Sequence, residues 1–313
     1  MATNTALAAS GKAAPAPSQR LQGAGDWARR LPLLPALIFT IALTQLPFVM
    51  TIIVSFMNWN AYYPDERGFA GVDNFVRVFS NVNARKAVLV TIILTVSVVL
   101  ISLVLGLLIA LLLDRKFRGR GIVRTLMITP FLVVPVAAAL LWKHALYNPE
   151  YGLLNGMLTA IFGDNAPQPD WISNNPLIAI IVALVWQWTP FMMLILLAGL
   201  TSRPMDVVEA AKIDGASSWQ IFTHMTLPHL RQYIELSGLL GAIYVVQNFD
   251  HVFTITSGGL GTANLPYFIY QTFYTAQDYG RASAAGVVVV IGTMIIATLA
   301  LRTAFSLFKE ENK

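Results

Sequence analysis

The residues best suited to binding a ligand lie in two short polar stretches within long apolar runs. One stretch is "WQWTPF", which contains Trp186, Gln187 and Thr189. The other is "YVVQNFD", which contributes Tyr244, Gln247, Asn248 and Asp250. Polar side chains within a membrane-spanning helix are costly and tend to face a cavity or the bundle interior. Aromatic rings beside amide groups suit a polyhydroxylated ligand, because rings cover C–H faces while amides donate and accept hydrogen bonds.

A structural role is the alternative for part of this set. Tryptophans such as Trp186 and Trp188 often belong to the aromatic belts at membrane interfaces. Pro190 could simply kink its helix. We nevertheless expect the two stretches to line a substrate path.

Signatures of catalysis and of metal binding are absent from the sequence. The four histidines, His144, His224, His229 and His251, are scattered and show no H-E-x-x-H pairing. There is no G-x-x-x-x-G-K-[ST] phosphate loop and no G-x-S-x-G nucleophile element. Cysteine is absent, which excludes disulfides and thiolate metal sites. We therefore expect neither an enzyme nor a protein that needs a metal or a cofactor.

The composition predicts a membrane protein. Apolar residues make up 56% of the 313 residues and charged residues only 12%, against about one quarter charged in soluble domains. Lys and Arg lie in short patches beside apolar runs rather than along one aromatic-rich face, which argues against a nucleic-acid partner. The apolar surface is expected to contact membrane lipid.

Apolar windows of the length that a spanning helix needs, about 20 residues, recur along the chain. Six are predicted: Leu31–Trp59, Ala87–Leu113, Thr125–Trp142, Pro176–Leu200, Leu230–Phe253 and Ala282–Leu301. The window from Leu230 is the weakest, because Arg231 and Glu235 lie near its start and polar residues lie at its end. The chain is therefore expected to be all-α.

Lys and Arg in the short loops predict the orientation in the membrane. They gather after the second, fourth and sixth windows, which places these segments and both termini in the cytoplasm. The loop 147–176 contains neither Lys nor Arg and is expected outside. Residues 1–30 are rich in Ala, Gly, Pro and Ser, which predicts a disordered cytoplasmic tail before a transmembrane domain over 31–313.

A polar passage at about 203–229 interrupts the apolar pattern. Pro204 is suited to open a helix, and Gly215 is suited to end it with a left-handed turn. Ser217 and Gln220 have capping-box spacing for a second helix. Leu227-Pro228 is predicted to break that helix. A helix–turn–helix follows, and the alternative is an amphipathic helix that only rests on the membrane surface.

Within this passage, Glu209-Ala210-Ala211, Asp214-Gly215-Ala216 and Leu227-Pro228 resemble the EAA motif of ABC importer permeases. The six predicted spans and the "TSGG" loop also resemble the carbohydrate branch of that family. The resemblance implies a type I permease fold in the bacterial inner membrane, with 203–229 as the cytoplasmic coupling element. It also implies ABC ATPase subunits, a second permease subunit and an extracytoplasmic solute-binding protein as partners.

Two later stretches suggest a narrower substrate class. "NLPYFIYQ" and "AAGVVVVIGT" are similar to permeases of sorbitol and mannitol importers, which implies a sugar alcohol. A phosphorylated substrate is disfavoured, because Arg231 is the only Arg or Lys in the predicted fourth and fifth spans. Another carbohydrate, such as an oligosaccharide, stays open. An ion-coupled secondary transporter is a further alternative, although mid-membrane charges and inverted repeats are not evident.

Overall fold

The computed structural model describes residues 31–310, so the predicted tail 1–30 lies outside the described residues. The described residues divide into two compact units, of which the first ends at Met50 and the second begins at Thr51. Nearly all ordered elements are helices. The α-helices are α2 (Leu34–Ser55), α3 (Asp73–Ser80), α4 (Val82–Asp114), α5 (Arg120–Leu132), α6 (Pro135–Leu140), α7 (Leu153–Phe162), α8 (Trp171–Asn174), α9 (Pro176–Thr201), α10 (Met205–Ile213), α11 (Ser218–Ile221), α12 (Leu227–Val246), α13 (Leu265–Tyr270) and α14 (Tyr279–Glu310).

Short helical segments and one minimal strand pair complete the chain. The 3₁₀ turns are η1 (Leu31–Leu33) and η2 (Pro64–Glu66), and the π-helical segments are η3 (Leu141–Leu146), η4 (Phe222–Thr226), η5 (Val252–Thr256) and η6 (Gln271–Thr275). The strands β1 (Met57–Asn58) and β2 (Gly68–Phe69) pair antiparallel, which is a small departure from the predicted all-α class.

Three of the predicted spans form unbroken helices of spanning length and composition within the described residues. They are Leu31–Ser55, Val82–Asp114 and Pro176–Thr201. The predicted fifth and sixth spans coincide with α12 and α14. α12 ends at Val246, earlier than predicted, because the backbone leaves the helix at Gln247. The fold is that of a helical membrane protein, as predicted.

The predicted third span is a bent pair of helices instead of one rod. α5 and the continuous segment Pro135–Leu146 meet at 96°. Val133 and Val134 between them have extended backbone, with ψ of 133° and 134°. Pro135 explains the break, because a proline disfavours helical geometry in the residue before it.

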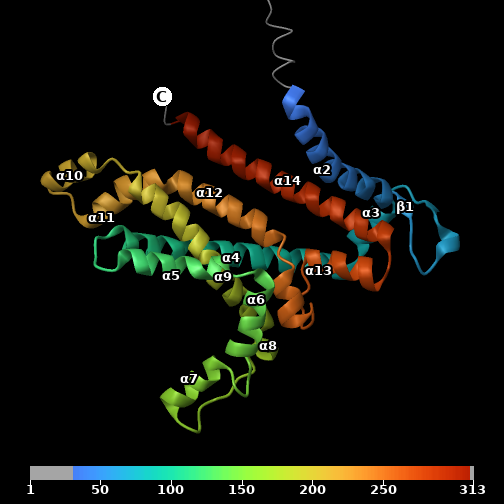
Figure 1. Cartoon of the computed structure of the whole chain (residues 1–313), viewed down its shortest axis with the longest axis horizontal. Coiled ribbons are helices and arrows are strands. Elements are labelled where there is room, and N and C mark those ends of the chain that lie inside the picture. The colour runs from blue at the N-terminus through green and yellow to red at the C-terminus, as the bar shows by residue number, and fades with distance from the viewer. Residues whose placement is uncertain (1–30, 311–313) are drawn as a thin grey trace, which may run out of the picture. The chain divides into compact units, whose positions relative to one another are not determined.

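α4 and α9 form the centre of the unit 51–313. Their buried faces share Val98, Ile180 and Leu184, all fully buried, within one apolar cluster. Gly106 of α4 lies so close to α9 that an added Cβ would be 2.9 Å from the backbone nitrogen of Met193. Small residues allow helices in membranes to approach in this way. Figure 1 shows α10 and α11 beyond one end of the α4, α5, α9 and α12 group, and α13 toward the other end.

Candidate functional site

The turn between α10 and α11 is built as predicted. The Ala216 N–H donates to the Ala211 carbonyl at 2.9 Å, and the Gly215 N–H donates to the Lys212 carbonyl at 3.2 Å. These two bonds form a Schellman motif, in which the residue after the helix takes a left-handed conformation. Gly215 has φ of 88°, and an added Cβ would meet nothing within 4 Å. Backbone conformation, and not space, is therefore what requires glycine here.

The start of the second helix is also as predicted. The Ser217 N–H donates to Gln220 Oε1 at 2.8 Å, and the Gln220 N–H donates to Ser217 Oγ at 3.3 Å. This reciprocal pair is a capping box. The Schellman motif and the capping box adjoin. Backbone groups at the end of α10 and at the start of α11 therefore find hydrogen-bond partners within the turn itself.

The predicted helix break at Leu227-Pro228 is wrong. α11 continues through the π-helical segment η4 into α12, and Leu227 has helical φ of −66° and ψ of −43°. The Leu227 N–H donates to the carbonyl of Phe222, five residues earlier. This wider turn relieves the constraint at Pro228, which lacks an N–H and would crowd the carbonyl four residues before it in a regular α-helix. The helix therefore continues past the proline.

The loop presents an apolar surface to its surroundings. Val208 and Ile221 are buried, whereas Ile213 is 86% exposed and Trp219 is 70% exposed. The Glu209 side chain is exposed as well, and none of the described residues bonds to its carboxylate. Ala210 is exposed and Ala211 half-buried, so a partner could approach the α10 backbone closely here. An exposed apolar patch on a projecting element is typical of an interaction site.

Arg203 anchors the base of this loop, a role that the sequence did not reveal. Its guanidinium donates to the Asp114 carboxylate at 2.6 Å, to Thr226 Oγ1 at 2.9 Å and to the Leu200 carbonyl at 2.9 Å. The side chains of Arg203 and Asp114 are 12% and 29% exposed. The anchor thus joins the last residue of α4, the end of α9 and η4, just before α12.

A second contact near the anchor holds α9 against α12. Ser202 Oγ lies 3.1 Å from His229 Nε2 and 2.9 Å from the Tyr233 hydroxyl. Gly199 allows the close approach, because an added Cβ would lie 2.6 Å from the Tyr233 ring. The projecting loop therefore begins and ends at neighbouring points of the bundle, where α9 and α12 are in contact.

The polar residues of "WQWTPF" make bonds within the bundle. Gln187 is buried, and its Nε2 donates to the Val133 carbonyl at 2.9 Å, at the bend between α5 and α6. Thr189 Oγ1 donates to the Val185 carbonyl of its own helix at 2.6 Å. The Trp186 ring packs edge-on against Trp142, with centroids 5.9 Å apart. Gln187 and Trp186 therefore join α9 to the bent third span.

Tyr244 lies in an aromatic cluster that three helices build. Its ring stacks on Trp188 with centroids 5.4 Å apart, and Phe131 and Phe191 pack on the same Trp188 ring. Tyr244 is 56% exposed, so one side of this cluster is open. Phe131 and Phe191 were not singled out in the sequence, because an aromatic residue in an apolar run carries no distinguishing signal there.

Gln247, Asn248 and Asp250 lie where the chain leaves α12 and enters η5. Gln247 is exposed and its Nε2 donates to the Ile243 carbonyl at 3.0 Å. Asn248 Nδ2 lies 3.2 Å from His251 Nδ1, while Asn248 Oδ1 and His251 Nε2 are buried without a partner among the described residues. Asp250 is half-buried. The predicted path residues therefore fall into three groups: Gln187 at the bend, Tyr244 in the aromatic cluster and Asn248 at the break.

Within residues 31–310, no group of three or more His, Asp or Glu side chains is arranged to hold a metal ion. The chemistry available at the site is hydrogen bonding and ring contact.

Solved structures share this fold. A bacterial ABC transporter involved in the import of the acidic polysaccharide alginate aligns with a TM-score of 0.77, at 22% identity, over 90% of this chain and 96% of that one. A crystal structure of a bacterial alginate ABC transporter with a pentasaccharide-bound periplasmic protein aligns with a TM-score of 0.75, at 22% identity, over 88% of this chain and 93% of that one.

Related sequences match over most of their length. The probable ABC transporter permease protein y4oQ of Sinorhizobium fredii is 34% identical over 84% of this chain and 85% of that protein. The trehalose/maltose transport system permease protein MalF of Thermococcus litoralis is 33% identical over 83% of this chain and 88% of that protein. Residues 102–307 match the family model "Binding-protein-dependent transport system inner membrane component". The chain belongs to this family of ABC transporter permeases.

Proposed function

We propose that this chain is the permease subunit of an ATP-driven importer for an uncharged carbohydrate, with the 203–229 loop as its contact to the ATPase. The observation that carries the coupling role is the projecting helix–turn–helix. Its turn is fixed by Gly215 and the Ser217 capping box, it exposes Ile213 and Trp219, and Arg203 ties its base to the bundle. A rigid, anchored element with an apolar tip is suited to transmit movement from a soluble partner.

The partners follow from this role. ABC ATPase subunits supply the energy, an extracytoplasmic solute-binding protein delivers the ligand, and a second permease subunit completes the path. The predicted topology, with both termini and the 203–229 loop in the cytoplasm, places the coupling element on the side where ATP is available. Uptake into the cell is the direction that a binding-protein-dependent system requires.

A sugar alcohol such as sorbitol or mannitol is one candidate substrate, supported by the similarity of "NLPYFIYQ" and "AAGVVVVIGT" to polyol permeases. The stacked Trp188 and Tyr244 rings can cover the C–H face of a carbohydrate. Asn248 Oδ1 is a buried acceptor with no hydrogen-bond partner among residues 31–310. Trehalose, maltose or another oligosaccharide is the second candidate, because several relatives are named as trehalose or trehalose/maltose permeases.

Uptake measurements separate the two substrate candidates. Cells with and without this chain should be compared for uptake of labelled mannitol, sorbitol, trehalose and maltose, with glycerol 3-phosphate as the anionic control. We expect uptake of a polyol to depend on the chain and uptake of the phosphate ester to be independent of it. Dependence of trehalose or maltose uptake alone would favour the oligosaccharide. Dependence of glycerol 3-phosphate uptake alone would contradict an uncharged cargo.

A charge reversal on the loop tests the coupling role. Glu209→Lys should leave the protein inserted in the membrane while reducing substrate-stimulated ATP hydrolysis by the complex, because a lysine would face the partner where the carboxylate now lies. Glu150→Lys, at an exposed position outside the loop, is the matched control and should leave the stimulation unchanged. Normal stimulation of ATP hydrolysis in Glu209→Lys would show that Glu209 is not part of the docking surface.

A further inference from the structure

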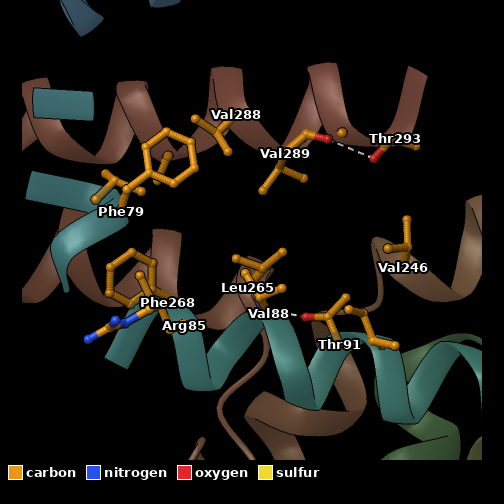
Figure 2. A pocket seen from close by; sticks show the side chains of 15 residues that line it. Phe79, Arg85, Val88, Thr91, Val246, Leu265, Phe268, Val288, Val289 and Thr293 are labelled. Carbon is orange, nitrogen blue, oxygen red and sulfur yellow. Dashed lines mark hydrogen bonds between the residues drawn. The ribbon is translucent and has the colours of Figure 1, made fainter. Parts of the chain in front are cut away.

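An apolar cavity shares no lining residue with the proposed path or the coupling loop, although Val246 of its lining lies between Tyr244 and Gln247 in the sequence. It has a volume of about 320 Å³ and lies between α3, α4, α13 and α14, with Val246 at the end of α12 closing one end. Figure 2 shows Val288 and Val289 of α14 facing Val88 of α4 across it. The volume falls at the lower end of the range for ligand pockets, about 300–1,000 Å³.

The two hydroxyl groups of the lining are already engaged. Thr91 Oγ1 donates to the Ala87 carbonyl at 2.7 Å and accepts from the Leu265 N–H at 2.9 Å. Thr293 Oγ1 donates to the Val289 carbonyl at 2.8 Å. A carbohydrate in this cavity would lose its hydrogen bonds to water and gain none, which is costly. A hydrocarbon chain makes no hydrogen bonds to water and would therefore avoid this cost.

One charged residue, Arg85, lies on the lining of this cavity. It lies in the first turn of α4, and Figure 2 places it at one end of the cavity with Phe79, opposite Val246 and Thr293. Its side chain is exposed and makes no hydrogen bond or ion pair with any residue of the described part of the chain. Arg85 and Ile92 are seven residues apart, which is about 10 Å along the helix axis.

The cavity lining includes exposed apolar side chains of α4. Val88 is 41% exposed and Ile92 is 53% exposed, and both lie on the lining. The apolar space therefore extends from a cation at the end of α4, a helix of spanning length and composition, along an exposed apolar face of that helix. A phospholipid has the same order of groups, with an anionic phosphate at the interface and an acyl chain below it.

We propose that this cavity is a binding site for an anionic phospholipid, with an acyl chain between α4 and α14 and the headgroup phosphate paired with Arg85. The site is separate from the carbohydrate path, and its occupancy does not depend on which substrate is carried. Filling the cavity with hydrocarbon supports the packing of α14 against α3 and α4. Arg85 makes the site prefer an anionic over a zwitterionic headgroup.

Photo-crosslinking tests this site on the complete transporter complex, with all subunits that accompany the chain in the membrane. The complex is reconstituted with phosphatidylglycerol or phosphatidylcholine that carries a photoreactive group in one acyl chain, and labelled peptides are identified by mass spectrometry. We expect labels on 88–92 and 288–293, with more labelling by phosphatidylglycerol. Labels confined to other segments would overturn the proposal. Protection of this face by a partner chain, shown by protein–protein cross-links in place of lipid labels, would also overturn it.

Two glycines of α14 provide a matched pair of variants. Gly292 lines the cavity and Gly286 does not, and an added Cβ meets nothing within 4 Å at either position. Gly292→Leu, whose Cβ meets no neighbour, should therefore occupy part of the cavity and abolish the labels, whereas Gly286→Leu should keep them. Equal labelling of the two variants would overturn the acyl-chain assignment.

The headgroup preference is tested by charge removal. An exposed ion pair contributes about 0.2–1 kcal/mol, so Arg85→Gln should weaken phosphatidylglycerol labelling by up to about fivefold. It should weaken phosphatidylcholine labelling less, because choline offsets the charge of that phosphate. Lys86→Gln is the control, because Lys86 is a neighbouring exposed cation that does not line the cavity. An equal effect of both substitutions would show general surface attraction and would refute pairing with Arg85.

Discussion

The anchor at the base of the coupling loop predicts a specific loss of stability. Arg203→Met removes a donor to the Asp114 carboxylate, to Thr226 Oγ1 and to the Leu200 carbonyl, while it keeps the length of an apolar stem. An exposed ion pair contributes about 0.2–1 kcal/mol. Removing one partner from a fully buried pair costs about 3–5 kcal/mol. The exposures of 12% and 29% place this pair between those limits.

We therefore expect Arg203→Met to lower the free energy of unfolding by about 2 kcal/mol. Titration with sodium dodecyl sulfate in detergent micelles measures this quantity, and Asp114→Asn with the double variant completes a mutant cycle. The matched control is Arg231→Met, since the exposed pair of Arg231 with Glu235, at 3.0 Å, lies within α12. That pair should contribute no more than about 0.5 kcal/mol.

The coupling energy from this mutant cycle decides whether the contact is an anchor. A coupling energy between Arg203 and Asp114 no larger than that of the Arg231 pair would show that the contact is not an anchor. A functional readout should accompany it: substrate-stimulated ATP hydrolysis should fall in Arg203→Met at a temperature where the protein stays folded, because the loop base is then free to move. Unchanged stimulation of ATP hydrolysis would show that the contact contributes to stability and not to coupling.

Three other outcomes follow from local geometry. Gly215→Leu should uncouple ATP hydrolysis, because a side chain at φ of 88° costs about 1–2 kcal/mol, while Gly215→Asn should retain most coupling; equal activity of both would contradict the turn. Gly199→Ala should destabilise the protein by about 1–3 kcal/mol in the same detergent titration, since its Cβ would press on Tyr233, and unchanged stability would contradict that packing. Single cysteines at Ser217 and Asn165 should react from the cytoplasm and from outside, respectively; external labelling of Ser217 would overturn the topology.

Local signals predicted the turn of the coupling loop well. Gly215 and the spacing of Ser217 and Gln220 determine hydrogen bonds within a few residues, and the structure contains those bonds. Pro228 was misinterpreted for an equally local reason. A proline usually ends or kinks a helix, but the π-helical turn before Pro228 accommodates a residue that has no N–H to donate. No feature of a single sequence marks such a turn.

Contacts between distant segments could not be predicted. Arg203 and Asp114 are 89 residues apart, and in the sequence each was one more charged residue at the end of an apolar run. Gln187 and Val133 are 54 residues apart, and their bond exists because α5 and α6 bend where they meet α9. The choice between lining a path and supporting a bend depends on this packing. Polarity within a span therefore identified a region, and the structure shows how its side chains are used.

Reconstituted transport tests the central claim most directly. The complex should be purified with its ATPase subunits, placed in liposomes with ATP on the side of the 203–229 loop, and supplied with the binding protein and labelled carbohydrate on the other side. We predict uptake that requires both ATP hydrolysis and the binding protein and that is lost in Gly215→Leu. Uptake by this chain alone, driven by an ion gradient without ATP, would contradict the account.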